Sequence, residues 1–216
     1  AFLCVPANTP ERGLISSHPE KMQPGYTLYT AADAAQAILL DDEGEEVHRW
    51  EAPFSKVWPN AGQINGWVHD RSIYIRRAHA FPNGDLLALY ESPAHTPNGC
   101  GLAKLDRHGE VLWTFDENAH HDFAIAGNGA IITLTHTVSR EPREGWQKLA
   151  PPVIDEFVTI LTPAGAVVKT ISLFDSLAAS PFHLPVVMHT DQLGDVLHSN
   201  TVNIVGSQFA SHHEGV

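Results

Sequence analysis

The sequence predicts an all-β protein built from β-propeller blades, each made of four antiparallel strands. Two Asn-Gly pairs stand between apolar runs, and this is a strong signal for a tight hairpin. A second hairpin pattern, Asp or Thr followed three residues later by Gly and then by a β-branched strand, occurs three times. Corresponding glycines lie about 45 to 65 residues apart, the spacing expected of four-stranded repeats with variable loops.

The elements follow in order along the chain. Residues 1–24 are rich in Pro and Gly and predict an irregular lead-in. Residues 25–216 form the propeller domain, which starts with an aromatic strand over 25–30 and an acidic hairpin over 38–50. Blades are expected at about 79–116 and 121–173, each with an inner hairpin around an Asn-Gly turn of type I′. Type I′ requires positive φ at both central residues.

The predicted propeller domain is incomplete. Residues 138–153 are polar and Pro-rich and predict a loop, and residues from Phe174 onwards predict a short helix before the crossing to a third blade. The third blade is expected to begin at about Asp195, and no second strand follows in the sequence that could pair with Thr201–Val205. Because propellers close with four to eight blades, we expect the chain to be a fragment of a longer protein. The alternative is that another chain completes the sheet.

Composition excludes several classes of protein. The net charge is −12, with 25 acidic and 13 basic residues, and no run of Lys or Arg occurs, which argues against binding of nucleic acid or anionic membranes. No apolar run approaches the roughly 18 residues of a membrane span. Cys4 and Cys100 allow one disulfide or two free thiols, and they exclude a disulfide-dense scaffold. Residues 1–5 fit either the remnant of a trimmed leader or an ordinary apolar start.

The order of the motifs resembles the bacterial arylsulfate sulfotransferase family over about residues 25–206. The match rests on motif order and blade rhythm: Gly25-Tyr-Thr-Leu-Tyr29, Leu40-Asp-x-x-Gly44 with Val47-His48-x-Trp50, His120-His121-Asp122-Phe123 with Asn128-Gly129, and Asp195-Val-Leu-His198-Ser-Asn200. The resemblance implies a six-bladed propeller, of which this chain holds about half, located in the periplasm or otherwise outside the cytoplasm. An anchor in residues preceding Ala1 is one alternative.

The resemblance also implies an activity. Such a transferase moves a sulfuryl group from an aryl sulfate donor to a phenolic acceptor through a histidine intermediate, without cofactor or metal. His198, with Asn200, matches the element that places a histidine in the central funnel of the family. The histidine that carries the sulfuryl group and the family's arginine lie in later blades, so the competence of this chain alone is an open question.

The histidines that open inner strands should gather at one place in a closed fold. We therefore assign catalytic roles to His198 and His121 and substrate-binding roles to Asn200 and His79. A neutral imidazole can act as a nucleophile, and a neighbouring cation can take charge from sulfate oxygens. Each histidine also has an ordinary structural interpretation, most strongly His79, and Arg76-Arg77 fits a solvated surface pair.

Two alternatives remain at this stage. A metal site is disfavoured because His120 and His121, adjacent on a strand, point to opposite faces of the sheet. A non-catalytic propeller that serves as a scaffold or as a subunit of a larger, membrane-associated assembly is the second functional hypothesis, since fold does not imply function. Its partner would be a protein, or the missing C-terminal blades that complete the propeller.

Overall fold

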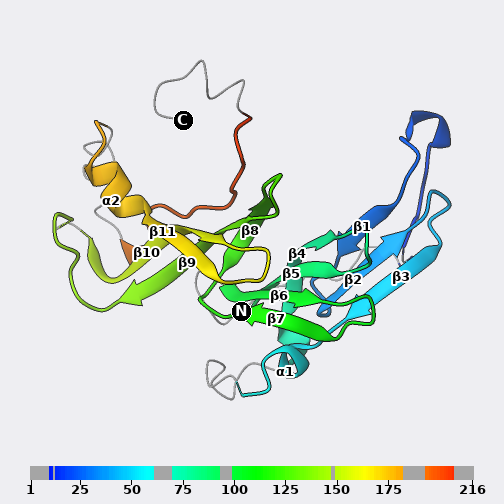
Figure 1. Cartoon of the computed structure of the whole chain (residues 1–216), viewed down its shortest axis with the longest axis horizontal. Helices are drawn as coiled ribbons and strands as arrows, with labels where there is room; N and C mark the ends of the chain where they lie inside the picture. The colour runs from blue at the N-terminus through cyan, green and yellow to red at the C-terminus, as the bar shows by residue number, and fades with distance from the viewer. Residues whose placement is uncertain are drawn as a thin grey trace.

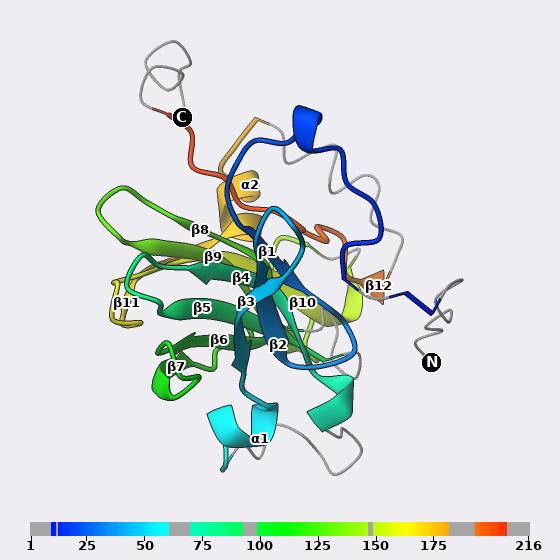
Figure 2. The ribbon, with the colours of Figure 1, turned by 90° about the vertical axis from the view of Figure 1, so that its right-hand side faces the viewer.

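The described residues form three β-sheets, antiparallel except for the short β12, that stand side by side (Figures 1 and 2). The computed structural model describes residues 10–11, 13–60, 70–92, 99–146, 149–181 and 193–206. The first sheet has the order β1-β2-β3, the second β4-β5-β6-β7 and the third β11-β10-β9-β8, with the short β12 parallel to β10. The described strands do not close into a ring. The all-β prediction is confirmed.

The strands are short, as is usual for sheets connected by hairpins. Their bounds are β1 Thr27–Thr30, β2 Gln36–Leu40, β3 Glu46–Glu51, β4 Tyr74–Ala80, β5 Leu86–Glu91, β6 Gly99–Leu105, β7 Val111–Phe115, β8 His120–Ile125, β9 Ile131–Ser139, β10 Ala150–Leu161, β11 Val167–Ser172 and β12 Leu193–Gly194. Helical segments are η1 Pro19–Lys21, α1 Phe54–Val57, η2 Asp70–Ser72 and α2 Leu173–Ala178.

Five hairpin turns share one hydrogen-bond pattern, whether their sequence is Asn-Gly or Asp-x-x-Gly. In the β4–β5 turn the N–H of Phe81 donates to Asp85 and the N–H of Gly84 donates back to Phe81. Gly84 has φ +89°, whereas Asn83 is not left-handed. The expected type I′ turn, with positive φ at both central residues, is therefore wrong. The turn is a type I turn closed by a left-handed glycine, and the Asn83 side chain accepts from Asp85.

Strand β5 is the centre of the core because both of its faces are buried. Leu86, Ala88 and Tyr90 pack toward the first sheet, and Leu87 and Leu89 pack toward the third. Alternating side chains point to opposite faces of a strand, so one apolar run serves two interfaces. The packing of the second sheet between its two neighbours follows from this single sequence, Leu-Leu-Ala-Leu-Tyr.

Several predicted boundaries shift in the structure. The strand expected to open at His79 begins at Tyr74, so His79 lies near its end. Strands β9 and β10 extend to Ser139 and from Ala150, which leaves a shorter connection than the predicted loop over 138–153. The predicted short helix is present as α2, with the Ser172 side chain accepting from Asp175 at its N-terminus. Cys100 is a buried free thiol, and Cys4 lies outside the described residues.

Two glycines of one turn give a matched test of this geometry. Gly129 has φ +83°, and a Cβ there would lie 3.2 Å from Pro163, whereas Gly127 has open space and no left-handed φ. Gly129→Ala should therefore lower the free energy of unfolding by about 1–2 kcal/mol, the cost of left-handed backbone. Gly127→Ala should leave it unchanged or raise it slightly. Denaturant titration measures both, and equal effects would contradict the turn assignment.

Candidate functional site

A β-bulge on β4 opens the candidate site. Ile75 pairs with Tyr90 and Arg77 pairs with Leu89, so Arg76 is an extra residue between two paired positions. A bulge redirects the side chains around it, and bulges are frequent beside active sites. Arg76 and Arg77 are therefore both half-exposed, at 51% and 50% of their side chains, instead of pointing to opposite faces.

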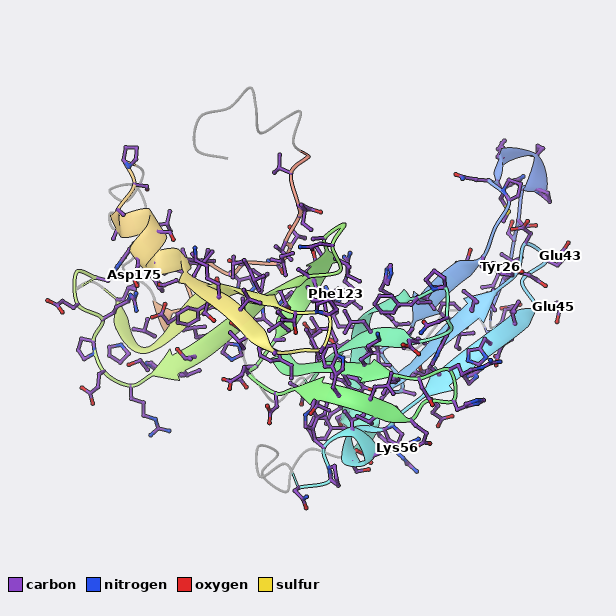
Figure 3. The ribbon with its side chains drawn as sticks, in the orientation of Figure 1. Tyr26, Glu43, Glu45, Lys56, Phe123 and Asp175 are labelled. Carbon is purple, nitrogen blue, oxygen red and sulfur yellow. The ribbon has the colours of Figure 1, made fainter. Side chains whose placement is uncertain are left out.

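A larger bulge interrupts β8, the neighbouring first strand. His120 pairs with Leu134 and Phe123 pairs with Thr133, so His121 and Asp122 have no opposite residue on β9. His121 takes φ +60°, the left-handed region that a β-strand residue rarely adopts. Because of this turn in the backbone, His121 and Asp122 project toward the bulge of β4. Phe123 lies beside them where the second and third sheets meet (Figure 3).

Glu91 connects the two bulges. Its Oε1 accepts the backbone N–H of His121 at 2.8 Å, and its Oε2 accepts the Tyr74 hydroxyl at 3.1 Å. Arg76 Nε lies 3.8 Å from the same Oε2, and the Glu91 side chain is only 3% exposed. Burial, followed by the charge of Glu91, raises the pKa of Tyr74 to about 12, so its hydroxyl stays a donor. A buried carboxylate with these partners fixes the position of His121.

Asp122 makes a second link. Its Oδ1 lies 2.5 Å from Arg77 and accepts the N–H of Phe123 at 2.9 Å. Its Oδ2 accepts the N–H of Val202 at 3.0 Å, which ties the segment 195–206 to β8. The Arg77 guanidinium also lies 5.4 Å from the centre of the Phe123 ring. Asp122 thus joins β4, β8 and the segment that contains His198.

His120 lies beneath this surface and is fully buried. Its Nδ1 is 2.8 Å from Nδ1 of His121, so one of them donates and the other accepts. Its Nε2 is 3.9 Å from Oε1 of Glu156, and the ring of His136 is 5.3 Å away. Burial, with the neighbouring histidines, lowers the pKa of His120 to about 3. His120 is therefore neutral at physiological pH and holds His121 through an uncharged hydrogen bond.

His198 approaches from the segment 195–206. Its Nδ1 is 2.8 Å from Oδ2 of Asp195, and its ring lies 6.2 Å from that of His121. Ser199 anchors the segment, because its N–H and hydroxyl both donate to Glu156, the hydroxyl at 2.7 Å. Like His121, His198 has a left-handed backbone, with φ +46°. Its side chain is 62% exposed.

The arrangement supports proton transfer and nucleophilic chemistry at an imidazole. The Asp195 carboxylate accepts a hydrogen bond from Nδ1–H of His198, and this fixes the tautomer in which the lone pair is on Nε2. The His198 side chain is exposed. Burial has the largest effect on the pKa of His121 and lowers it, so the His121 imidazole, like that of His120, is mostly neutral at physiological pH. Arg76 and Arg77 supply positive charge within the same cluster, as the binding of an anionic group requires.

The structure brings His121 and His198 together, as the sequence predicted. Asn200 also lies in the cluster, where its side-chain amide donates to the backbone carbonyl of His198 at 2.6 Å. His79 lies elsewhere: its ring packs against Phe81 at 4.9 Å, near the far end of β4. Burial and the charge of Arg77 lower the pKa of His79. The expectation that His79 opens its strand beside the other histidines is wrong, and the roles of the remaining three stay predictions.

Sequence reasoning did not find Glu91 or Glu156, and it treated Arg76 and Arg77 as a surface pair. A signal for Glu91 was present, since it is the single charged residue that ends the apolar run of β5. Nothing comparable marks Glu156 in the sequence of β10. The arginines were interpreted as a solvated surface pair, whereas in the structure each lies beside a buried carboxylate, Arg76 by Glu91 and Arg77 by Asp122.

Among the described residues, no group of three or more His, Cys, Asp or Glu side chains is arranged to hold a metal ion. In the same residues, none of the helices has the length and apolar character needed to cross a membrane.

No protein-family model matches the chain, and none of the curated proteins compared with it is similar enough to be a relative.

The buried His120 predicts a specific pH dependence of stability. Its pKa is about 3 in the folded protein and about 6.5 when exposed, so the unfolded chain binds the extra proton as the pH falls below 6.5. Stability from this residue is present above pH 6.5 and is lost as the pH falls toward 3. By linkage, protonation of His120 in the unfolded chain should lower the free energy of unfolding by about 2 kcal/mol when the pH falls from 7 to 5.

Denaturant titrations of the wild type and His120→Gln at both pH values measure this contribution. The variant should lose less stability on acidification, even if it is less stable at pH 7. His18→Gln, a change of an exposed histidine in the lead-in, serves as the control and should follow the wild type. Parallel losses in wild type and His120→Gln would show that His120 is not held neutral by burial.

Proposed function

We propose that the chain is part of an arylsulfate sulfotransferase-like enzyme, in which the cluster of His121, His198, Asp195, Arg76 and Arg77 handles the transferred sulfuryl group. The observation that carries this proposal is the Asp195–His198 pair, whose exposed imidazole lies 6.2 Å from the His121 ring. Arg76 and Arg77 join the cluster through Glu91 and Asp122. The motifs that carry the sequence resemblance include His121, Asp195 and His198, but neither arginine. An extracytoplasmic location is part of the proposal and rests on that resemblance alone.

The fold supports the proposal through its architecture. Three twisted antiparallel sheets stand side by side, and the first strands β4 and β8 of adjacent sheets contact each other (Figure 2). We interpret these sheets as blades of a propeller, about half of a six-bladed ring. In such a ring the first strands line the central funnel, where propeller enzymes have room for a ligand. The two bulges would then face that funnel.

His198 is suited to act as general base and acid. In the formation of the sulfuryl intermediate, a nucleophilic imidazole nitrogen bonds to sulfur while the bond between sulfur and the aryl oxygen breaks, and the leaving oxygen takes a proton from protonated Nε2 of His198. In the transfer to the acceptor, the phenolic oxygen bonds to sulfur while the bond between sulfur and that imidazole nitrogen breaks, and the phenolic proton moves to Nε2 of His198. Asp195 stabilises the imidazolium through Nδ1. The imidazole that carries the sulfuryl group is expected in later blades.

A scaffold role is the second candidate, and one observation favours it. Arg76 and Arg77 already pair with Glu91 and Asp122 of the same chain, as they would in a cluster that only stabilises the fold. A guanidinium has five N–H donors, however, and one carboxylate leaves donors for a sulfate. Activity measurements distinguish the two candidates, because a scaffold needs no intact Asp195–His198 pair.

The decisive assay uses the natural protein that contains this chain, with a chromogenic aryl sulfate. Release of the coloured phenol should require an added phenolic acceptor. His198→Ala should abolish transfer, and Asp195→Asn should lower the rate by about 10²-fold or more, because the tautomer is no longer fixed.

The matched control is His18→Ala, an exposed histidine far from the cluster, which should keep the wild-type rate. Circular dichroism and thermal melting show whether each variant is folded. Full activity of a folded His198→Ala protein would refute the assigned role. Absence of any phenol-dependent release from the wild-type protein would favour the scaffold.

A further inference from the structure

A hollow of about 560 Å³ lies between the first sheet and the hairpin turns of the second sheet. Tyr26 and residues of β2 and β3 line one side, the β4–β5 turn lines the other, and Arg107 of the β6–β7 turn completes the lining. The hollow lies at the end of β4 that is opposite to the bulge, so it is separate from the His121–His198 cluster. Its volume is typical of a site for a small molecule.

Hydrogen bonds between the two sheets fix the shape of the hollow. The buried indole of Trp50 donates from Nε1 to the carbonyl oxygen of Gly84 at 3.0 Å. Nε2 of His48 lies 2.9 Å from the carbonyl oxygen of Arg107, and this nitrogen carries the proton because a carbonyl only accepts. The His48 and Trp50 rings are in edge contact at 4.3 Å. The two sides of the hollow are therefore joined before any ligand binds, which lowers the entropic cost of binding.

Aromatic and apolar side chains make up most of the lining. Phe81 contacts the ring of His79 at 4.9 Å, and the Lys104 ammonium lies 4.6 Å from the centre of the Phe81 ring. Tyr26, labelled beside β1 in Figure 3, is 68% exposed, and Val47 is 49% exposed. Among the large apolar side chains that the structure describes, Tyr26 has the largest exposed fraction. Exposed apolar residues that gather at a concave surface indicate a binding site.

Arg107 gives the hollow a positive charge. Arg49 and Lys104 of the same two sheets each pair with a carboxylate, whereas the guanidinium of Arg107 forms no ion pair with any residue in the described part of the chain. Of the described residues that line the hollow, Arg107 is the only Lys, Arg, Asp or Glu. The net charge of the whole protein is −12, so this positive charge is a local exception. The guanidinium keeps its N–H donors for an anion.

We propose that this hollow binds a small aromatic anion, a planar ring that carries one acidic group. The ring would lie against the aromatic side chains of Tyr26, Trp50 and Phe81, and the acidic group would accept hydrogen bonds from Arg107. No residue of the His121–His198 cluster takes part, so the proposal does not depend on the sulfotransferase-like function.

The lining favours this class of ligand over two others. Aromatic rings also attract cations, but Arg107 would repel a cation at this position. An aliphatic anion would pair with Arg107 and would lose the stacking that aromatic rings provide. A ring and a negative charge in one molecule match both features of the hollow.

The binding experiment uses naphthalene-2-sulfonate as the probe. Its sulfur is bonded to carbon, so a sulfuryl transferase cannot consume it and the result is independent of any transfer activity. Titration into the 216-residue chain, followed by amide and indole NMR signals, should shift the Trp50 indole N–H and the Gly84 amide together. A Kd of about 0.1–1 mM is expected for a ligand of this size.

Two variants of exposed residues separate the charge from the ring. Arg107→Gln should weaken naphthalene-2-sulfonate about 10-fold and leave the uncharged 2-naphthol unchanged, because a hydrogen bond to a charged group is lost only for the anion. Tyr26→Ser should weaken both compounds about 3- to 10-fold through lost stacking. The matched control is Arg71→Gln, a change of an exposed arginine outside the hollow, which should bind both compounds as the wild type does.

The proposal would be overturned by the absence of shifts at Trp50 and Gly84 up to 10-fold above the expected Kd. Unchanged binding of the sulfonate by folded Arg107→Gln would also overturn it, as would equal losses in Arg107→Gln and Arg71→Gln. Tighter binding of the cation 2-naphthylmethylammonium than of the sulfonate would assign the hollow to cations instead. Weaker binding of this cation and of cyclohexanesulfonate, which has the charge without the aromatic ring, would support the proposal.

Discussion

The buried carboxylate of Glu91 is the constraint on which the candidate site depends. Removing a carboxylate from water is costly unless donors surround it. Glu91 has three: the hydroxyl of Tyr74, the N–H of His121 and the guanidinium of Arg76. These donors come from strands on both sides of the interface between the second and third sheets. The carboxylate therefore fixes the distance between the two bulges, and the geometry of the histidines follows from it.

The strained backbone of the cluster is offset by hydrogen bonds to two buried glutamates. His121 and His198 are left-handed, which costs a non-glycine residue about 1–2 kcal/mol. Glu91 accepts the N–H of His121, and Glu156 accepts the N–H of Ser199 next to His198. In each case a buried glutamate holds the residue in a conformation that the strand alone would not adopt. Strain that is maintained in this way is characteristic of binding and catalytic sites.

Turn chemistry made most of the fold predictable from the sequence. Each tight turn has two local signals: a glycine at its end and an Asx or Thr side chain that accepts nearby N–H groups. These signals predicted the positions of the hairpins correctly. The bulges could not be predicted in the same way, because an extra residue on one strand is defined only by its partner strand. His79 was grouped with His121 for another reason: its strand was expected to open at that residue, whereas β4 begins at Tyr74. His198 was singled out by its resemblance to a family motif, and the structure places its ring 6.2 Å from that of His121.

The strands β4 and β8 each have two tasks: the backbone pairs with the next strand of its own sheet, and side chains at the bulge contact the neighbouring sheet. In β8 both tasks are met, since Phe123–Ile125 pair with β9 while the preceding bulge turns His121 outward. In the segment 195–206 only the second task is met, because Ser199 and Val202 are fixed to carboxylates of the third sheet. A strand that pairs with Thr201–Val205 would therefore hold His198 more firmly, since the backbone that follows it would be fixed at both ends.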